Sequence, residues 1–132
     1  MKRSTIATLC FCLTPILAFA QQRTLSSLST TVPNYAKYEI VQSPLLARLT
    51  IRLDRFTGET WQFVNTAKKS FAWQLMPRIS MAHDEKIPGK VNYQIFVSGI
   101  RAQITILMNT NTGTSWYIVE DPKAGDFWTP MQ

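Results

Sequence analysis

Cysteine is absent from the chain beyond residue 12. Cys10 and Cys12 both lie in an apolar N-terminal stretch, and neither follows the small residue that a lipidation signal requires. Small exported proteins often depend on disulfide bonds because their cores are small. About 110 residues follow this stretch, which is enough for a modest core. We therefore expect a fold that is held together by its core alone.

Residues that bind metals or perform catalysis are also scarce. His83 is the only histidine and stands beside Asp84 and Glu85 in a polar segment. A zinc or redox-metal site generally uses several histidine or cysteine ligands, so we interpret this segment as a solvated loop. No serine lies in a nucleophile-elbow pattern, and the five glycines are isolated. The sequence predicts a protein that is not an enzyme and that carries no cofactor or metal.

The chain also lacks a dense run of charge. Its formal net charge of +6 falls to +4 when Lys2 and Arg3 are removed, and the remaining basic residues are spread along the sequence. A nucleic-acid-binding protein concentrates its basic residues in a patch or stripe. We therefore expect no nucleic-acid partner.

Residues 1–20 have the features of a cleavable signal peptide. Lys2 and Arg3 form a positive start, residues 6–17 are mostly apolar, and Ala18-Phe19-Ala20 matches the small-residue cleavage pattern. The apolar part is too short for a membrane-spanning helix, which needs about 20 residues. We predict a periplasmic or secreted protein with no stable membrane anchor after cleavage.

The rest of the chain contains an internal repeat. Residues 38–64 and 93–119 align without a gap at an offset of 55, and the offset continues to Trp73 and Trp128. All four tryptophans therefore occupy two repeated positions, and such self-similarity indicates a duplicated structural unit. The predicted organisation is listed by range: a flexible lead (21–36), repeat unit 1 (37–77), a polar linker (78–91) and repeat unit 2 (92–132).

Each unit has the pattern of antiparallel strands. Residues 48–54 alternate strictly, which predicts that Leu49, Ile51 and Leu53 are buried while Arg48 and Arg52 face outward. By alignment, unit 2 is expected to bury Ile104, Ile106 and Met108 and to turn Leu107 outward.

A hairpin follows this strand in both units. Asp54 or Asn109 can cap a tight turn with its side chain, and Gly58 or Gly113 can supply a positive φ. A small sheet cannot bury its apolar face alone, so the units should cover each other. We predict an all-β fold of two tandem antiparallel meander units, with three to four strands each, packed as a pseudo-two-fold sandwich or barrel.

The hairpin Leu53–Trp61 carries a family resemblance. It resembles the Leu-Asp-x-x-Thr-Gly-x-x-Trp repeats of small exported bacterial proteins of unassigned function. It is also similar to the Asp-x-x-Thr-Gly…Trp docking motif of quinoprotein-type β-propeller blades. Propellers need about four to eight blades, so this second resemblance implies assembly from several two-unit chains. Some small Trp-rich bacterial lectins are built in that way and bind sugars between blades.

The tryptophans are the first candidate binding residues. Trp61 and Trp116 are expected in the core, because they alternate in phase with Phe63 and Ile118. Trp73 and Trp128 lie in short aromatic segments next to a proline, where their rings either pack under a loop or form an exposed platform.

The arginines of unit 1 are the second candidates. Unit 1 has a formal charge of +3 and unit 2 of −1, and Arg48, Arg52 and Arg55 are near one another in the sequence. They form either a solvated face or a basic patch for an anionic partner. We expect a non-enzymatic interaction module that binds a protein or an anionic envelope component. The alternative is a lectin-like glycan-binding protein, including an oligomeric propeller assembled from two-unit chains.

Overall fold

The structure is a computed structural model that describes residues 28–29 and 32–132. The expected signal peptide, residues 1–20, lies outside the described residues, as does most of the expected flexible lead. Two residues of that lead, Leu28–Ser29, form a short strand β1 that pairs antiparallel with β2. The lead is thus part of the sheet at this point.

The described part of the chain is all-β. It contains nine strands: β1 (Leu28–Ser29), β2 (Tyr38–Gln42), β3 (Thr50–Asp54), β4 (Thr60–Asn65), β5 (Phe71–Met76), β6 (Tyr93–Val97), β7 (Thr105–Asn109), β8 (Ser115–Val119) and β9 (Phe127–Pro130). Within these residues no helix is long and apolar enough to cross a membrane.

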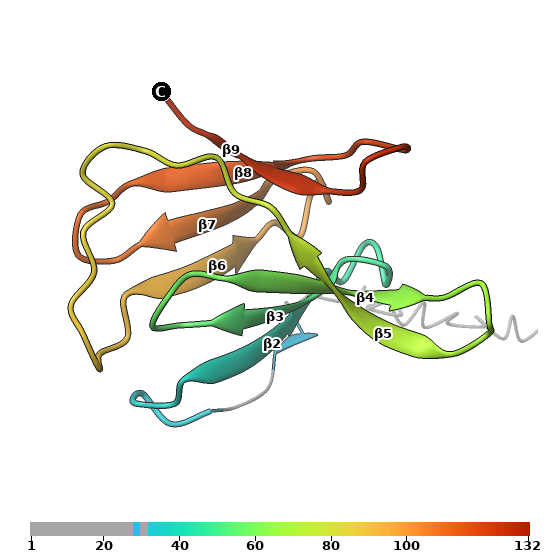
Figure 1. Cartoon of the computed structure of the whole chain (residues 1–132), viewed down its shortest axis with the longest axis horizontal. Coiled ribbons are helices and arrows are strands. Elements are labelled where there is room, and N and C mark those ends of the chain that lie inside the picture. Colours follow the sequence, from blue (N-terminus) through green and yellow to red (C-terminus); the bar gives the residue numbers. More distant parts are fainter. Residues whose placement is uncertain (1–27, 30–31) are drawn as a thin grey trace, which may run out of the picture.

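The strands form two antiparallel meander sheets. Sheet 1 has the order β1-β2-β3-β4-β5 and sheet 2 the order β6-β7-β8-β9. Sheet 1 occupies the lower half of Figure 1 and sheet 2 the upper half. Every neighbour in each sheet follows its partner directly along the chain, so all connections within a sheet are hairpins. The fold class expected from the repeat, two tandem meander units packed together, is confirmed.

The β3–β4 and β7–β8 turns have the capping that their sequences predict. The carboxylate of Asp54 accepts hydrogen bonds from the backbone N–H of Phe56 and Thr57 at 2.9 and 3.1 Å. Asn109 Oδ1 accepts the two equivalent bonds in unit 2. Gly58 and Gly113 have φ of 75° and 77°, a conformation that favours glycine.

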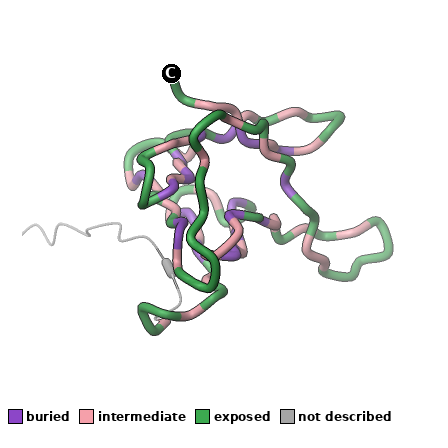
Figure 2. Tube along the Cα trace, turned by 60° about the vertical axis from the view of Figure 1, so that its left-hand side comes forward, coloured by how far each residue is buried: buried purple, intermediate pink, exposed green. Residues whose placement is uncertain are grey.

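A single core fills the space between the sheets, and Figure 2 shows buried segments in the middle of the molecule and exposed turns around it. The burial predicted from the alternation of residues 48–54 is confirmed, because Leu49, Ile51 and Leu53 are all buried. The buried core residues are Leu49, Ile51, Leu53, Met76, Tyr93, Leu107, Trp116, Ile118 and Trp128. We call the face of each sheet that lines this core its inner face.

The prediction for the equivalent strand of unit 2 is wrong. Leu107 is completely buried, Ile104 is exposed, and Ile106 and Met108 are only partly buried. Both faces of this segment carry apolar residues, so the alternation pattern does not determine which face is covered. The inner face of β7 is formed by Thr105, Leu107 and Asn109.

This reversal changes the relation between the two units. Thr60 in β4 and Trp116 in β8 are both buried, although the repeat makes Thr60 equivalent to Ser115 and Trp61 equivalent to Trp116. A two-fold axis would bury equivalent faces, whereas here opposite faces of the repeat meet. The units therefore pack face to back, and the pseudo-two-fold part of the expectation does not hold.

The linker 78–91 is anchored to the core. The Arg78 guanidinium lies 4.5 Å from the ring centroid of Trp116 and 3.1 Å from the Asp84 carboxylate. Asp84 Oδ1 also accepts hydrogen bonds from the Tyr93 hydroxyl and the Asn109 amide. The segment therefore closes one side of the core, although His83 itself is exposed.

Candidate interaction face

The outer face of sheet 1 is built around Arg52. Its guanidinium carbon lies 4.3 Å from the ring centroid of Trp61 and 5.1 Å from that of Trp73. Such cation–π contacts stabilise an arginine on aromatic rings and hold its planar group in one orientation. Arg52 Nε is buried and makes no hydrogen bond within the described residues.

Strand register brings these side chains together. Arg52 is the cross-strand partner of Trp61, and Phe63 is the partner of Trp73. Phe63 stacks on Phe71 with ring centroids 5.0 Å apart and meets Trp73 edge-on at 5.5 Å. Aromatic pairs of this kind stabilise a sheet beyond the area that they bury.

Much of this surface is exposed. Phe71 is 70% exposed, Leu75 54% and Phe63 38%. A contiguous exposed apolar patch on a sheet marks an interaction site, and tryptophan and arginine are enriched where binding energy concentrates. We call this surface the aromatic face and define it by Arg52, Trp61, Phe63, Phe71, Trp73 and Leu75.

The structure separates the four tryptophans into two environments. Trp116 and Trp128 are fully buried, and the indole N–H of Trp128 donates to Thr60 Oγ1 at 2.6 Å. Trp128 is therefore a core residue and does not line the aromatic face. The expectation that Trp61 lies in the core is wrong, because this ring lies partly exposed on the outer face.

Arg48 and Arg55 lie apart from the aromatic face. Strand β3 begins at Thr50, so Arg48 belongs to the preceding turn, where its Nη2 lies 2.7 Å from a Glu120 carboxylate oxygen. The hydrogen bond with Glu120 raises the pKa of Arg48. Arg55 Nε lies 3.5 Å from Glu39, and its Nη1 donates to two backbone carbonyls.

The three arginines therefore do not form one basic patch. Two of them have an acidic partner, and only Arg52 is placed on the aromatic face. Sequence reasoning missed Phe63, Phe71 and Leu75 as members of this face. Phe71, Trp73 and Leu75 alternate along one strand, and this period-two pattern was the signal that could have identified them.

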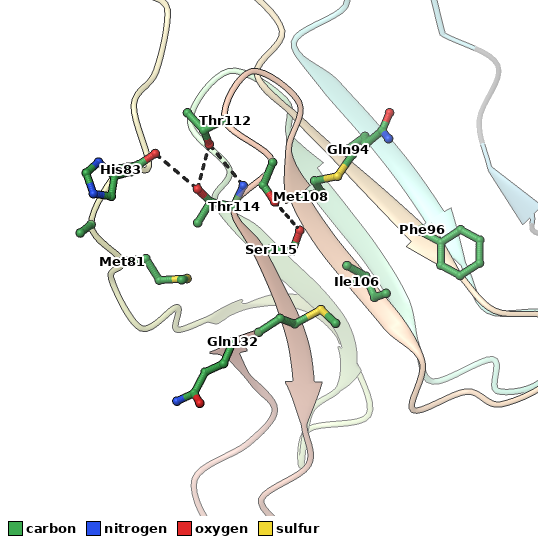
Figure 3. A pocket seen from close by; sticks show the side chains of 13 residues that line it. Met81, His83, Gln94, Phe96, Ile106, Met108, Thr112, Thr114, Ser115 and Gln132 are labelled. Atoms are coloured by element: carbon green, nitrogen blue, oxygen red, sulfur yellow. Dashed lines mark hydrogen bonds between the residues drawn. The ribbon is translucent and has the colours of Figure 1, made fainter.

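The outer face of sheet 2 contains a hollow of about 810 Å³. Its apolar lining comes mainly from Met81, Phe96, Ile106, Met108 and Met131. Figure 3 shows the side chains of strands β6 to β8 at this surface, with Ser115 and the threonines of the β7–β8 turn at one side. Ser115 Oγ donates to the Gly113 carbonyl at 2.8 Å. We refer to this surface as the hollow.

The polar chemistry of the hollow is limited. Among the residues that line the hollow, His83 alone has an ionisable side chain, and it lies at the edge, where its carbonyl accepts a hydrogen bond from Thr114. Across residues 28–29 and 32–132, no group of three or more His, Cys, Asp or Glu side chains could hold a metal ion. The geometry of both surfaces suits apolar contact.

Comparison of the chain with protein-family models, with curated proteins and with solved structures finds no match.

Proposed function

We propose that this chain is a non-enzymatic interaction module that binds a protein partner through the aromatic face. The observation that carries the proposal is the arrangement of Arg52 against Trp61 and Trp73, beside the exposed Phe71 and Leu75. Rigid aromatic rings and a preoriented guanidinium lose little conformational freedom when a partner covers them. The signal-peptide features of residues 1–20 support a periplasmic or secreted location.

A protein partner fits this surface better than an anionic envelope component. The positive charges of Arg48 and Arg55 are paired with Glu120 and Glu39, and Arg52 contributes the single guanidinium of the aromatic face. Electrostatic attraction to a polyanion needs several free charges and fades with salt. We therefore expect binding that depends on apolar burial and changes little between low and high salt.

Site-specific photocrosslinking tests the proposal. A benzophenone side chain replaces Leu75 on the aromatic face, and a matched chain carries it at the exposed Gln103. In the cells that make the protein, we expect a discrete protein adduct from position 75 alone. The additional substitution Trp73→Ser, in a chain whose circular dichroism is unchanged, should remove that adduct. The same adducts from both positions, or none from position 75, would contradict the proposal.

A glycan is the second candidate ligand, and one observation favours it. Trp73 is partly exposed, and the Arg52 guanidinium lies beside its ring. A sugar ring can stack on an indole while a guanidinium donates to its hydroxyl groups. Titration with a panel of soluble oligosaccharides in 1 M salt should then quench tryptophan fluorescence. A panel that leaves the spectrum unchanged rejects this candidate.

A further inference from the structure

We propose that the aromatic face of one chain docks onto the hollow of a second copy. The two surfaces would pack as the inner face of sheet 2 packs on the inner face of sheet 1 within the chain. This inference rests on the proposed function and identifies its protein partner. Its basis is the face-to-back packing of two equivalent sheets, which leaves one copy of each packing surface uncovered by the described residues.

The aromatic face is equivalent to the inner face of sheet 2. The offset of 55 relates Trp61 to Trp116 and Trp73 to Trp128. The register agrees, because Trp61 pairs with Leu75 as Trp116 pairs with Pro130. In sheet 2 both tryptophans are completely buried against sheet 1. The same surface in sheet 1 has no sheet against it within the described chain.

The hollow is equivalent to the inner face of sheet 1. Val41 of sheet 1 is buried, with 3% of its surface exposed, whereas Phe96, its equivalent, is 57% exposed. Met76 and Met131 form a second such pair, at 3% and 42%. Two further apolar pairs are Ile51 with Ile106 and Leu53 with Met108. The hollow thus has the apolar pattern of a surface that another sheet covers elsewhere in the same molecule.

Polar groups of the intramolecular contact also have equivalents on the free faces. The Trp128 indole N–H donates to the Thr60 hydroxyl across the two sheets. The repeat places Trp73 on the aromatic face and Ser115, another hydroxyl residue, at the hollow. Docking would therefore bring an indole donor to a hydroxyl acceptor a second time.

At one pair of contacting positions, both residue types differ between the packed surfaces and the free surfaces. Within the chain, Gln62 Nε2 donates to Asp126 at 3.0 Å across the sheets. Their equivalents are Tyr117 and Phe71, which are 40% and 70% exposed on the two free faces. The polar pair inside the chain would thus correspond to an aromatic pair between two copies. Each surface would still meet a residue of matching chemistry on the other.

Arg52 is compatible with burial under a second copy. Within the chain, the Arg78 guanidinium carbon already lies 4.5 Å from the ring centroid of the buried Trp116. Arg52 has the same relation to Trp61 at 4.3 Å. A guanidinium therefore lies over the tryptophan at this repeat position both on the packed inner face of sheet 2 and on the free aromatic face.

The contact joins two different surfaces, so it is heterologous. Each added copy presents both surfaces again, and the series ends only when a ring closes. Rings built from packed meander sheets have about four to eight sheets, which corresponds to roughly two to four copies of this chain. We expect a discrete assembly of this size.

Two surface variants test the docking. One carries Phe71→Arg and Leu75→Arg on the aromatic face. The other carries Phe96→Arg at the hollow and Tyr117→Arg beside it on the same outer face of sheet 2. All four residues are exposed, so the core should be unaffected, and circular dichroism checks the fold. Native mass spectrometry should show the unaltered chain as an assembly and each variant alone as a monomer, with association at least tenfold weaker.

An equimolar mixture of the two variants gives the decisive result. The intact aromatic face of one variant can dock once onto the intact hollow of the other, so we expect a one-to-one heterodimer and nothing larger. A control chain with Tyr35→Arg and Ile100→Arg, also at exposed positions, should assemble like the unaltered protein.

Two outcomes would overturn the inference. One is a monomeric unaltered chain. The other is self-association of the hollow variant alone, since that would mean that aromatic faces pair with each other. A monomer that still forms the photocrosslinked adduct with another protein would leave the proposed function standing. A monomer without any adduct would remove both.

Discussion

Trp73 and Trp128 share one repeat position and have different physical roles. The Trp128 ring is fully buried and its N–H has a partner at 2.6 Å, whereas Trp73 is partly exposed. Trp128→Phe removes buried apolar area and leaves Thr60 without its donor, so it should lower the free energy of unfolding by about 2 kcal/mol. Urea denaturation in a chain that carries Leu75→Arg measures this without a contribution from association.

Trp73→Phe is the matched control for that substitution. It changes a partly exposed ring and should cost less than about 0.5 kcal/mol. Equal losses at the two positions would mean that the two rings are equally buried, and would contradict the face-to-back packing.

Tyr93 gives a residue-scale prediction about pH. Burial, with a further contribution from the hydrogen bond to Asp84, raises the pKa of its hydroxyl to about 12. In the unfolded chain the pKa is about 10, so the folded state holds this proton more tightly. Its contribution to stability is complete below pH 10 and is lost as the pH rises toward 12.

The free energy of unfolding should therefore fall across this interval by on the order of 2 kcal/mol more in the unaltered chain than in Tyr93→Phe. Denaturant unfolding at a series of pH values measures the difference. Parallel pH profiles for the two chains would show that the Tyr93 hydroxyl is not buried.

At the scale of elements, the two hairpin turns differ in what surrounds their glycines. A Cβ at Gly58 would lie 2.5 Å from Arg78 Nη1 and 2.8 Å from the Tyr93 ring, while a Cβ at Gly113 would meet nothing within 4 Å. Both positions have positive φ, so both substitutions carry backbone strain.

Gly58→Ala should therefore destabilise the protein by about 1–2 kcal/mol more than Gly113→Ala, because only the first also displaces packed side chains. Thermal unfolding of the two variants provides the comparison. A larger loss for Gly113→Ala would be inconsistent with the way the linker packs on the first turn.

The strands and turns of this fold could be predicted from the sequence because their signals are local. Alternation predicted a strand in residues 48–54, where β3 lies, and the Asp54 and Asn109 turns followed from cap and glycine spacing. The structure also explains why unit 2 has an asparagine, Asn109, where unit 1 has Asp54. The Asn109 amide donates to Asp84, which a second carboxylate could not do, whereas Asp54 lies 3.3 Å from Lys37.

The buried face of each sheet could not be predicted in the same way. Residues 104–108 are apolar on both sides, so the choice between Ile106 and Leu107 depends on which surface the other sheet covers. The candidate site was affected for the same reason. Aligned tryptophans were expected to share an environment, and the reversal of faces put Trp61 and Trp73 outside while it buried Trp116 and Trp128.

At the scale of the whole molecule, one fact unites these observations. Two equivalent sheets pack face to back. The molecule therefore presents two different surfaces, the aromatic face and the hollow, which are equivalent to the two inner faces of its own core. The exposed aromatic rings, the hollow and the paired change at Phe71 and Tyr117 are all consequences of that arrangement. The central claim is that a second copy of this chain covers the aromatic face of the first.

The most direct test is the absolute mass of residues 21–132 in solution, measured by size-exclusion chromatography with light scattering. The account predicts a discrete multiple of the single-chain mass that persists in 1 M salt, because the contact is apolar. The mass of a single chain at every concentration would contradict it.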